Sequence, residues 1–238
     1  MSDTRFERVK LFADGADLAG ILALSEDPAI SGFTTNPTLM RQAGVYDYEW
    51  FARSLLHTIP DRPISLEVFA DSPADMERQA VKIASWGPQV YVKIPVTNTK
   101  GEFTGPLLRR LAADGVKVNV TALMTVAQVE SVIECLSDGP AACISVFAGR
   151  IADTGRDPIP IMKQALEVMA AYPNVELIWA SPREVLNIVQ ADEIGCDIIT
   201  VTHDLLQKLH TYGKDLDQFS LETVQMFHRD ALASGYQL

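Results

Sequence analysis

Gln89-Val90-Tyr91-Val92-Lys93-Ile94-Pro95-Val96 is the stretch from which we infer the fold, because it combines a buried strand with an interior lysine. The run is rich in valine and ends at a proline and a Thr-Asn pair, which is typical of a buried strand. Strand side chains alternate between two faces, so Val92 and Ile94 point one way and Tyr91 and Lys93 the other. For one lysine, an ion pair with a neighbouring carboxylate is the simpler interpretation. The alternative is a desolvated, neutral amine, which is a nucleophile that forms a Schiff base with a carbonyl compound.

Strand-like and helix-like runs alternate along the whole chain. The expected strands are residues 9–13, 32–36, 63–70, 89–96, 116–123, 142–147, 175–180 and 197–201. The expected helices are residues 17–24, 46–58, 74–86, 105–114, 125–136, 158–171 and 183–194. Eight such units predict a single α/β domain, a parallel (β/α)₈ TIM barrel, over residues 1–202. A C-terminal helical extension, residues 203–238, follows with a break near 212–214. An open doubly wound sheet is the structural alternative, but the turn after the first strand is not the glycine-rich one that this fold usually has.

Composition restricts the classes of partner. The chain has 238 residues, of which 47% are hydrophobic and 21% charged, and its net charge of −11 argues against nucleic acid and anionic membranes as partners. Its three cysteines and four histidines lack the spacings of metal ligands, so we expect no metal, no zinc site and no disulfide framework. Neither a signal peptide nor a transmembrane run is recognisable, and we expect a cytoplasmic protein.

One face of most strands is aliphatic and the other is polar. The aliphatic face must meet the helices, so the polar face lines the barrel, where polar groups are costly unless they are paired. So many of them near the carboxyl ends of the strands predict an active site around Lys93. The residues expected on this face are Phe12, Asp14, Thr34, Asn36, Ser65, Glu67, Lys117, Asn119, Thr121, Cys143, Ser145, Phe147, Trp179 and Ser181.

Two arginines follow the sixth and seventh expected strands. Arg150 lies in Phe147-Ala148-Gly149-Arg150, and Arg183 follows Ser181-Pro182. TIM barrels often bind phosphate in the loops after their late strands, and a serine with two arginines would suit a phosphate dianion. Each arginine alone is as compatible with a surface loop, whereas the pair favours a phosphorylated substrate.

An ordered set of motifs resembles the transaldolase family, class I aldolases on a (β/α)₈ barrel, and in particular the short subfamily that includes fructose-6-phosphate aldolase. The set runs from the first strand to the seventh. Its members are Phe12-Ala13-Asp14, Thr34-Thr35-Asn36-Pro37-Thr38, Ser65-Leu66-Glu67-Val68, Val92-Lys93-Ile94-Pro95, Asn119-Val120-Thr121, Ser145-Val146-Phe147-Ala148-Gly149-Arg150-Ile151 and Ala180-Ser181-Pro182-Arg183.

The resemblance implies a role for each residue. Lys93 would be the Schiff-base lysine, Asp14 the acid/base at the scissile carbon–carbon bond, and Glu67 with Thr121 the holders of a catalytic water. The implied substrate-binding residues are Asn36, Asn119 and Ser145 for a dihydroxyacetone unit, Phe147, and Arg150, Ser181 and Arg183 for the sugar phosphate. No cofactor is implied. Short members often form rings of five or ten chains, so a homo-oligomer is expected, with the C-terminal helix reaching a neighbour.

Two positions favour transfer over release of the dihydroxyacetone unit. Simple aldolases in the family tend to have glutamine at the position of Glu67 and tyrosine at that of Phe147, and this chain has the transaldolase-like residue at both. The expected activity is therefore a transaldolase acting on sugar phosphates. The alternatives are an aldolase that releases dihydroxyacetone and a sugar-phosphate-binding barrel without turnover. The chain departs from the family pattern at three places around the expected mouth of the pocket: Gly15, Pro182 and the polar segment 97–103.

Overall fold

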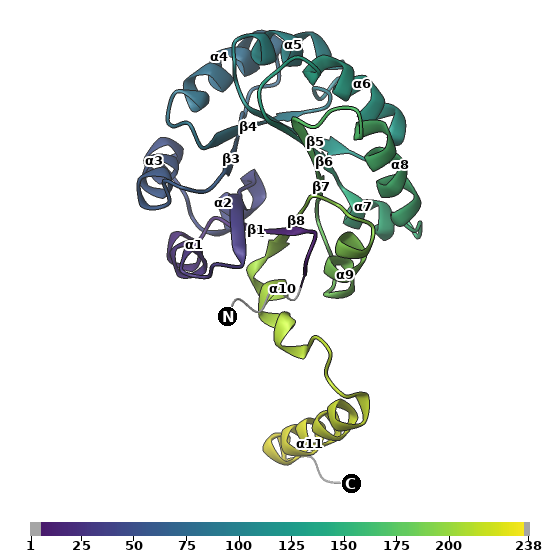
Figure 1. Ribbon diagram of the computed structural model, residues 1–238. Coiled ribbons are helices and arrows are strands. Elements are labelled where there is room, and N and C mark those ends of the chain that lie inside the picture. Colours follow the sequence, from purple (N-terminus) through teal and green to yellow (C-terminus); the bar gives the residue numbers. More distant parts are fainter. Residues whose placement is uncertain (1–5, 236–238) are drawn as a thin grey trace. The chain divides into compact units, whose positions relative to one another are not determined.

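The structure, a computed structural model, describes residues 6–235, whose eight strands form a closed, all-parallel barrel in sequence order (Figure 1). β8 pairs with β1 and closes the ring. The predicted TIM barrel is therefore confirmed. The strands are β1 (Lys10–Asp14), β2 (Ile30–Thr34), β3 (Ile64–Glu67), β4 (Val90–Pro95), β5 (Val118–Leu123), β6 (Ala142–Val146), β7 (Val175–Trp179) and β8 (Ile198–Thr202).

Helices follow the strands and surround the barrel (Figure 1). Several begin at a side chain that accepts a hydrogen bond from the first turn, as at Asp17, Asp47, Ser72 and Thr125. The helical elements are α1 (Leu18–Ser25), α2 (Pro37–Gln42), α3 (Tyr48–Thr58), α4 (Pro73–Ala84), α5 (Gly105–Ala113), α6 (Val126–Leu136), α7 (Ala148–Asp153), α8 (Ile159–Met169), α9 (Leu186–Glu193), α10 (His203–Gln207), the 3₁₀ helix η1 (Lys208–Thr211) and α11 (Leu216–Ser234).

The register of the strands determines which residues share the interior. Lys93 is aligned with Glu67 on β3 and with Asn119 on β5, and Asp14 is aligned with Thr34 on β2. Aligned residues of a parallel pair point to the same face, so this polar set lies inside the barrel. The alternation predicted for β4 is also found, because Val90, Val92 and Ile94 are buried and the residues between them are partly exposed.

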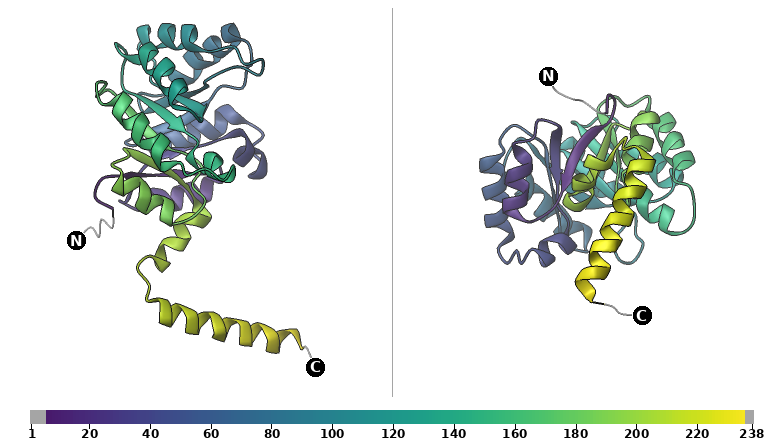
Figure 2. Two further views of the ribbon diagram at one scale, coloured as in Figure 1. Left: turned by 90° about the vertical axis from the view of Figure 1, so that its right-hand side faces the viewer. Right: turned by 90° about the horizontal axis from the view of Figure 1, so that it is seen from below.

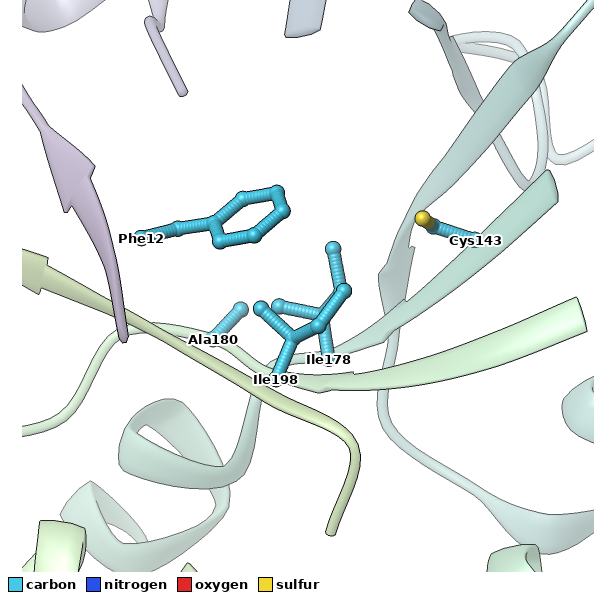
Figure 3. Close-up of a cluster of buried hydrophobic side chains, with 5 residues drawn as sticks. All are labelled: Phe12, Cys143, Ile178, Ala180 and Ile198. Atoms are coloured by element: carbon cyan, nitrogen blue, oxygen red, sulfur yellow. The ribbon is translucent and has the colours of Figure 1, made fainter. Parts of the chain in front are cut away.

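A cluster of apolar side chains fills another part of the interior between β1, β6, β7 and β8. Phe12, Cys143, Ile178, Ala180 and Ile198 are almost fully buried there (Figure 3). Tyr91 and Phe147, which are partly buried, pack against the cluster. The barrel is thus packed with side chains, and the polar set occupies only part of it.

Strand β7 differs from the sequence-based prediction. Trp179 was expected on the interior face, but Ile178 and Ala180 belong to the interior cluster and Trp179 has the opposite parity. Ile178 is also aligned with Ser145 of β6, which lies inside the barrel. The prediction for Trp179 was wrong because it assumed that strand alternation continues to Ser181, whereas Ser181 has a φ of +59° and lies beyond the regular strand; within β7, Glu176 shares the face of Ile178.

The residues divide into two compact units, Met1–Leu206 and Gln207–Leu238. The sequence-based division placed the extension slightly earlier, at residue 203. Within the second unit, α11 is one uninterrupted helix (Figure 2) with no buried residue. Among residues 6–235, no helix has the combination of length and hydrophobicity that a membrane span requires.

Candidate active site

Lys93 extends from β4 into the barrel interior, where its surroundings are mostly polar. Its side chain is 14% exposed, and its amine donates a hydrogen bond to the backbone oxygen of Thr35. The nearest described carboxylate oxygen is Oε2 of Glu67, 3.8 Å from Nζ. This distance is longer than a charge-assisted hydrogen bond, so the Lys93 amine lies close to the Glu67 carboxylate without a hydrogen bond to it.

Glu67 ends β3 and is 5% exposed. Burial raises the pKa of its carboxyl, whereas the charge of Lys93 and a hydrogen bond from Thr35 (3.2 Å) act in the opposite direction. Its second oxygen, Oε1, is buried and forms no hydrogen bond within the described chain. A buried carboxyl with a raised pKa and one uncommitted oxygen has the properties of a group that gives and accepts a proton.

Asp14 ends β1 on the interior face and is contacted by two residues of the following strand and turn. Thr34 Oγ1 donates to Oδ1 at 2.8 Å, and Asn36 Nδ2 donates to Oδ2 at 3.3 Å. Burial raises the pKa of the Asp14 carboxyl, and the charge of Lys93 is the largest opposing influence. Asp14 therefore has the environment of an acid/base group.

Asn36 is held by its position at the start of a helix. It is the N-cap of α2, where its side-chain oxygen accepts a hydrogen bond from the Leu39 amide at 2.9 Å, and Pro37 follows in the first turn. The remaining amide hydrogens of Asn36 point toward Asp14 and the barrel. Capping thus directs the Asn36 side chain toward Asp14.

Asn119 is the centre of a hydrogen-bonded row across three strands. Its Nδ2 donates to Ser65 Oγ on β3 at 3.0 Å, and its Oδ1 accepts from Ser145 Oγ on β6 at 2.7 Å. All three residues are buried. Because both ends of the amide are engaged, the row is fixed in orientation next to Lys93, with which Asn119 is aligned.

Thr121 is aligned with Pro95 at the carboxyl end of β5. The register between β5 and β6 shifts between Val120 and Leu123, an interval that includes Thr121, and Ala122 has a φ of +66°. A left-handed conformation is unfavourable for alanine and is found mainly where the surrounding structure enforces it, often at functional sites. The backbone therefore changes direction at the point where Thr121 meets the interior.

The two arginines lie on exposed segments after β6 and β7. The Arg150 guanidinium lies 5.5 Å from the centre of the Phe147 ring, and Arg183 Nε donates to Oδ1 of Asp153 at 3.1 Å. Both arginines lower the pKa of the Asp153 carboxyl, the nearer Arg183 more strongly. Asp153 on α7 is thus the ion-pair partner of Arg183 and lies within the electrostatic influence of Arg150.

Ser181 and α7 are in close contact through Gly149. The Gly149 amide donates to the backbone oxygen of Ala180 at 3.2 Å, and a Cβ at position 149 would lie 1.5 Å from the backbone oxygen of Ser181. Ser181 itself has a φ of +59°. Only glycine allows this approach, which brings the start of α7 and the segment after β7 together.

The predicted residues thus fall into two groups. The first surrounds Lys93 in the barrel and contains Asp14, Asn36, Glu67, Asn119, Thr121 and Ser145. The second, after β6 and β7, contains Phe147, Arg150, Ser181 and Arg183.

Sequence reasoning missed four residues that position these groups. Thr35 contacts both Lys93 and Glu67, and the Tyr48 hydroxyl donates to the backbone oxygen of Glu67 at 3.1 Å. Asp153 pairs with Arg183, and Asn187 Oδ1 accepts from the Arg183 amide at 2.7 Å. The Thr34-Thr35 pair was a usable signal, because two adjacent threonines at a strand end expose hydroxyls to both faces. Nothing in the local pattern marked Tyr48, Asp153 or Asn187.

Comparison with known proteins extends over almost the whole chain. Residues 11–237 match the family model described as Transaldolase/Fructose-6-phosphate aldolase. A "Probable transaldolase" of Dehalococcoides mccartyi is 32% identical over 84% of this chain and 90% of its own length. A "Probable transaldolase 2" of Listeria monocytogenes is 33% identical over 86% of this chain and 89% of its own.

Solved structures share the fold at low sequence identity. "QR15, an Aldolase" is similar with a TM-score of 0.57 and 14% identity, over 90% of this chain and all of its own. A dihydrodipicolinate synthase from Rhodopseudomonas palustris has a TM-score of 0.55 and 15% identity, over 81% of this chain and 69% of its own. At such identities the likeness extends to the barrel alone.

Proposed function

Because the chain belongs to the transaldolase/fructose-6-phosphate aldolase family, we propose that it is a transaldolase acting through a Schiff base on Lys93. Family and relatives support an enzyme of the aldolase class. In the proposed reaction, a dihydroxyacetone unit moves from a ketose phosphate such as fructose 6-phosphate to an aldose phosphate. The observation that carries the proposal is the Lys93 amine inside the barrel, next to Glu67 and within the field of Asp14.

The covalent steps start at the substrate carbonyl. The Lys93 nitrogen bonds to the carbonyl carbon, and the carbinolamine loses water to become an iminium ion. Asp14 then takes the proton of the hydroxyl next to the scissile bond. The electrons of that O–H bond form an aldehyde, the carbon–carbon bond breaks, and its electron pair enters the iminium to give an enamine. The enamine adds to an acceptor aldehyde, Asp14 returns the proton, and water releases Lys93.

Glu67 and Thr121 are proposed to hold the water that carries protons at the Schiff base. Carbinolamine formation and dehydration need a group that both gives and accepts a proton. The raised pKa of the Glu67 carboxyl and its uncommitted Oε1 atom support this role. Thr121 would contribute a hydroxyl from the adjacent side of Lys93.

Substrate recognition is assigned to the remaining residues. Asn36, Asn119 and Ser145 would orient the hydroxyl groups of the three-carbon unit, and Phe147 would border it. Arg150, Ser181 and Arg183 would bind the phosphate, which would then replace Asp153 as a partner of the guanidinium groups. Bidentate contacts between arginine and phosphate are strong enough to compete with an exposed carboxylate.

Transfer rather than release of the three-carbon unit rests on Glu67 and Phe147, as argued from the sequence. A dependence of turnover on an added aldose phosphate would separate the two reactions. A barrel that binds sugar phosphate without turnover is disfavoured, because Lys93, Asp14, Glu67 and Thr121 are all present.

Borohydride trapping with fructose 6-phosphate tests the proposal. A three-carbon adduct, found by intact mass and mapped to Lys93, is expected, because reduction would fix the enamine-derived iminium after cleavage. Lys93→Met should abolish the adduct, and Lys117→Met, at a lysine whose amine contacts the Pro88 backbone oxygen, should retain it. A six-carbon adduct would mean that this sugar binds without cleavage. Wild-type-like turnover by Lys93→Met would exclude the Schiff-base mechanism.

We also propose that the protein is a homo-oligomer, with a ring of five or ten chains as the arrangement to test. Support comes from the exposed apolar side chains of α11. Leu216, Phe219, Met226 and Phe227 lie on one side of the helix, and Leu221, Val224 and Leu232 lie elsewhere around it. An apolar helical face of this kind is usually covered by a partner.

A further inference from the structure

Thr200 of β8 belongs to the hydrogen-bonded surroundings of Asp14, although neither motif nor resemblance singled it out. Its side chain is 7% exposed, and its hydroxyl forms a close hydrogen bond with that of Thr34, which is 3% exposed. Thr34 in turn donates to Asp14 Oδ1 at 2.8 Å. Since β1 lies between β2 and β8, the two hydroxyls meet across the inner face of β1.

The direction of the Thr200–Thr34 bond follows from counting protons. An ionised carboxylate can only accept, and a threonine hydroxyl has one proton to give. If Asp14 is ionised, Thr34 donates its only proton to Asp14, so Thr200 must be the donor to Thr34. When Asp14 carries a proton on Oδ1, the hydroxyls of Thr34 and Thr200 can both rotate, which reverses the direction of the two hydrogen bonds without breaking any covalent bond. The row therefore satisfies both protonation states of an acid/base carboxyl.

We propose that Thr200 is a positioning residue for Asp14, acting through the hydroxyl of Thr34. This inference rests on the function proposed above. A hydrogen bond from Thr200 orients the Thr34 hydroxyl toward Asp14. It also polarises the O–H bond of Thr34, which strengthens the hydrogen bond from Thr34 to the Asp14 carboxylate. Both threonines are β-branched and therefore restricted about χ1, so the positions of the two hydroxyls vary little.

The consequence for acid/base chemistry has a definite sign. Hydrogen bonds to the ionised form of a carboxyl lower its pKa, so removal of the Thr200 hydroxyl should raise the pKa of Asp14. The charged group that lowers the pKa of Asp14 is Lys93 on β4, and Lys93 remains in such a variant, as does Glu67 on β3, whose pKa Asp14 raises. Cleavage needs Asp14 as a base, so the acid limb of kcat against pH should move to higher pH.

The test compares Thr200→Val, which removes the hydroxyl at constant shape, with Thr200→Ser, which keeps it. For Thr200→Val we expect kcat for fructose 6-phosphate cleavage to fall about tenfold, with KM changed less than about twofold and the acid limb moved to higher pH. The adduct on Lys93 should still form. Thr200→Ser should restore the pH profile, and Thr58→Val, an exposed hydroxyl bonded to its own helix, controls for the change of residue type.

Each outcome bears on a different claim. A wild-type pH profile in folded Thr200→Val, or a Thr200→Ser variant no better than Thr200→Val, would overturn the role of Thr200 alone. If Thr200→Val does not fold, Thr200→Ala provides the same comparison, with the same expected shift. A wild-type protein that forms no three-carbon adduct would overturn the proposed function and this inference together.

Discussion

At the scale of the residue, the site concentrates two carboxyl groups around one amine. Burial raises the pKa of both the Asp14 and the Glu67 carboxyl, the charge of Lys93 lowers both, and the charge of Asp14 further raises that of Glu67. Such an arrangement is unfavourable for folding and useful for proton transfer, because it keeps the pKa of each carboxyl above its ordinary range. Stability and catalysis should therefore respond in opposite directions to a neutral substitution.

Glu67→Gln should stabilise the protein at pH 8 and impair the reaction. The pKa of Glu67 is raised on folding, so the folded state binds more protons and loses stability as pH rises from the unfolded pKa through the folded one. Glutamine removes this loss. We expect Tm to rise by about 2–4 °C at pH 8, the change that about 1 kcal/mol causes in a domain of this size. Below pH 4 the gain should vanish.

Glu49→Gln is the matched control for this measurement, because the pKa of the exposed Glu49 carboxyl is lowered by hydrogen bonds from Lys82 and Arg53. Its stabilising contribution is present above the unfolded pKa and is lost in acid, so this substitution should not raise Tm at pH 8. A Glu67→Gln variant that melts below the wild type at pH 8 would contradict the assigned direction.

Asp153→Asn should strengthen phosphate binding. The Asp153 carboxylate pairs with Arg183 and competes with any anion that approaches the guanidinium. Its loss also makes the region more positive by one charge. We expect the inhibition constant of inorganic phosphate to fall about two- to fivefold, the size of effect typical of an exposed ion pair. Asp138→Asn, at an exposed aspartate in another loop, makes the same change in net charge and should leave this constant unaltered.

How much of the site was predictable from sequence depends on the polarity of each strand. In β3 and β5 the aliphatic face is unambiguous, so Glu67 and Asn119 could be assigned to the interior from alternation alone. In β7 the assignment of Trp179 failed because it was taken from the parity of Ser181, where the backbone has already left the strand conformation. Thr200 was overlooked because β8 has no charged or amide side chain to mark its inner face.

At the scale of the element, two short helices position residues of the two groups that make up the site. α2 and α7 have six residues each, too few for a hydrophobic period to indicate them, and neither was predicted as a helix. Yet α2 aims Asn36 through its cap, and α7 carries Arg150 and Asp153. Longer helices were predicted to within a few residues, because caps and periodicity agree there.

Gly149→Ala should separate α7 from the segment after β7. The added Cβ would overlap the backbone oxygen of Ser181, which cannot move away as a side-chain tip can. We expect a loss of about 1–3 kcal/mol in the free energy of unfolding, measured in urea, and a weaker affinity for phosphate. Ala152→Ser, at an exposed position of the same helix, should change neither. Unchanged stability would show that the two segments are not held as closely as the structure has them.

At the scale of the whole molecule, the sequence sufficed for the barrel and for the order of its strands. Sequential pairing with right-handed crossovers leaves few alternatives for eight alternating units. Closure, the pairing of β8 with β1, could be inferred only from the count of units, because no local feature encodes it. Whether a second copy covers α11, as proposed above, depends on contacts between chains, which no pattern within one chain specifies.

Association of chains through α11 can be tested in solution. In α11, Leu216, Phe219, Met226 and Phe227 project from one side of the helix, given 3.6 residues per turn, and all four are exposed. If this face binds a second copy, light scattering should give a mass that is a multiple of 26.1 kDa. Phe227→Glu would bury a charge at the contact and should shift the mass toward one chain, while the barrel keeps its Tm.

Leu221→Glu introduces the same charge on another side of α11 and should leave the mass unchanged, since Leu221 is well removed from the apolar face in angle. A wild-type mass of 26.1 kDa at all concentrations would exclude the proposed oligomer. An oligomer that persists in Phe227→Glu would instead mean that the chains associate through the barrel. The mass of the wild type shows whether an oligomer exists. The comparison of Phe227→Glu with Leu221→Glu then shows whether the apolar face of α11 forms the contact, because only Phe227→Glu places a charge on that face.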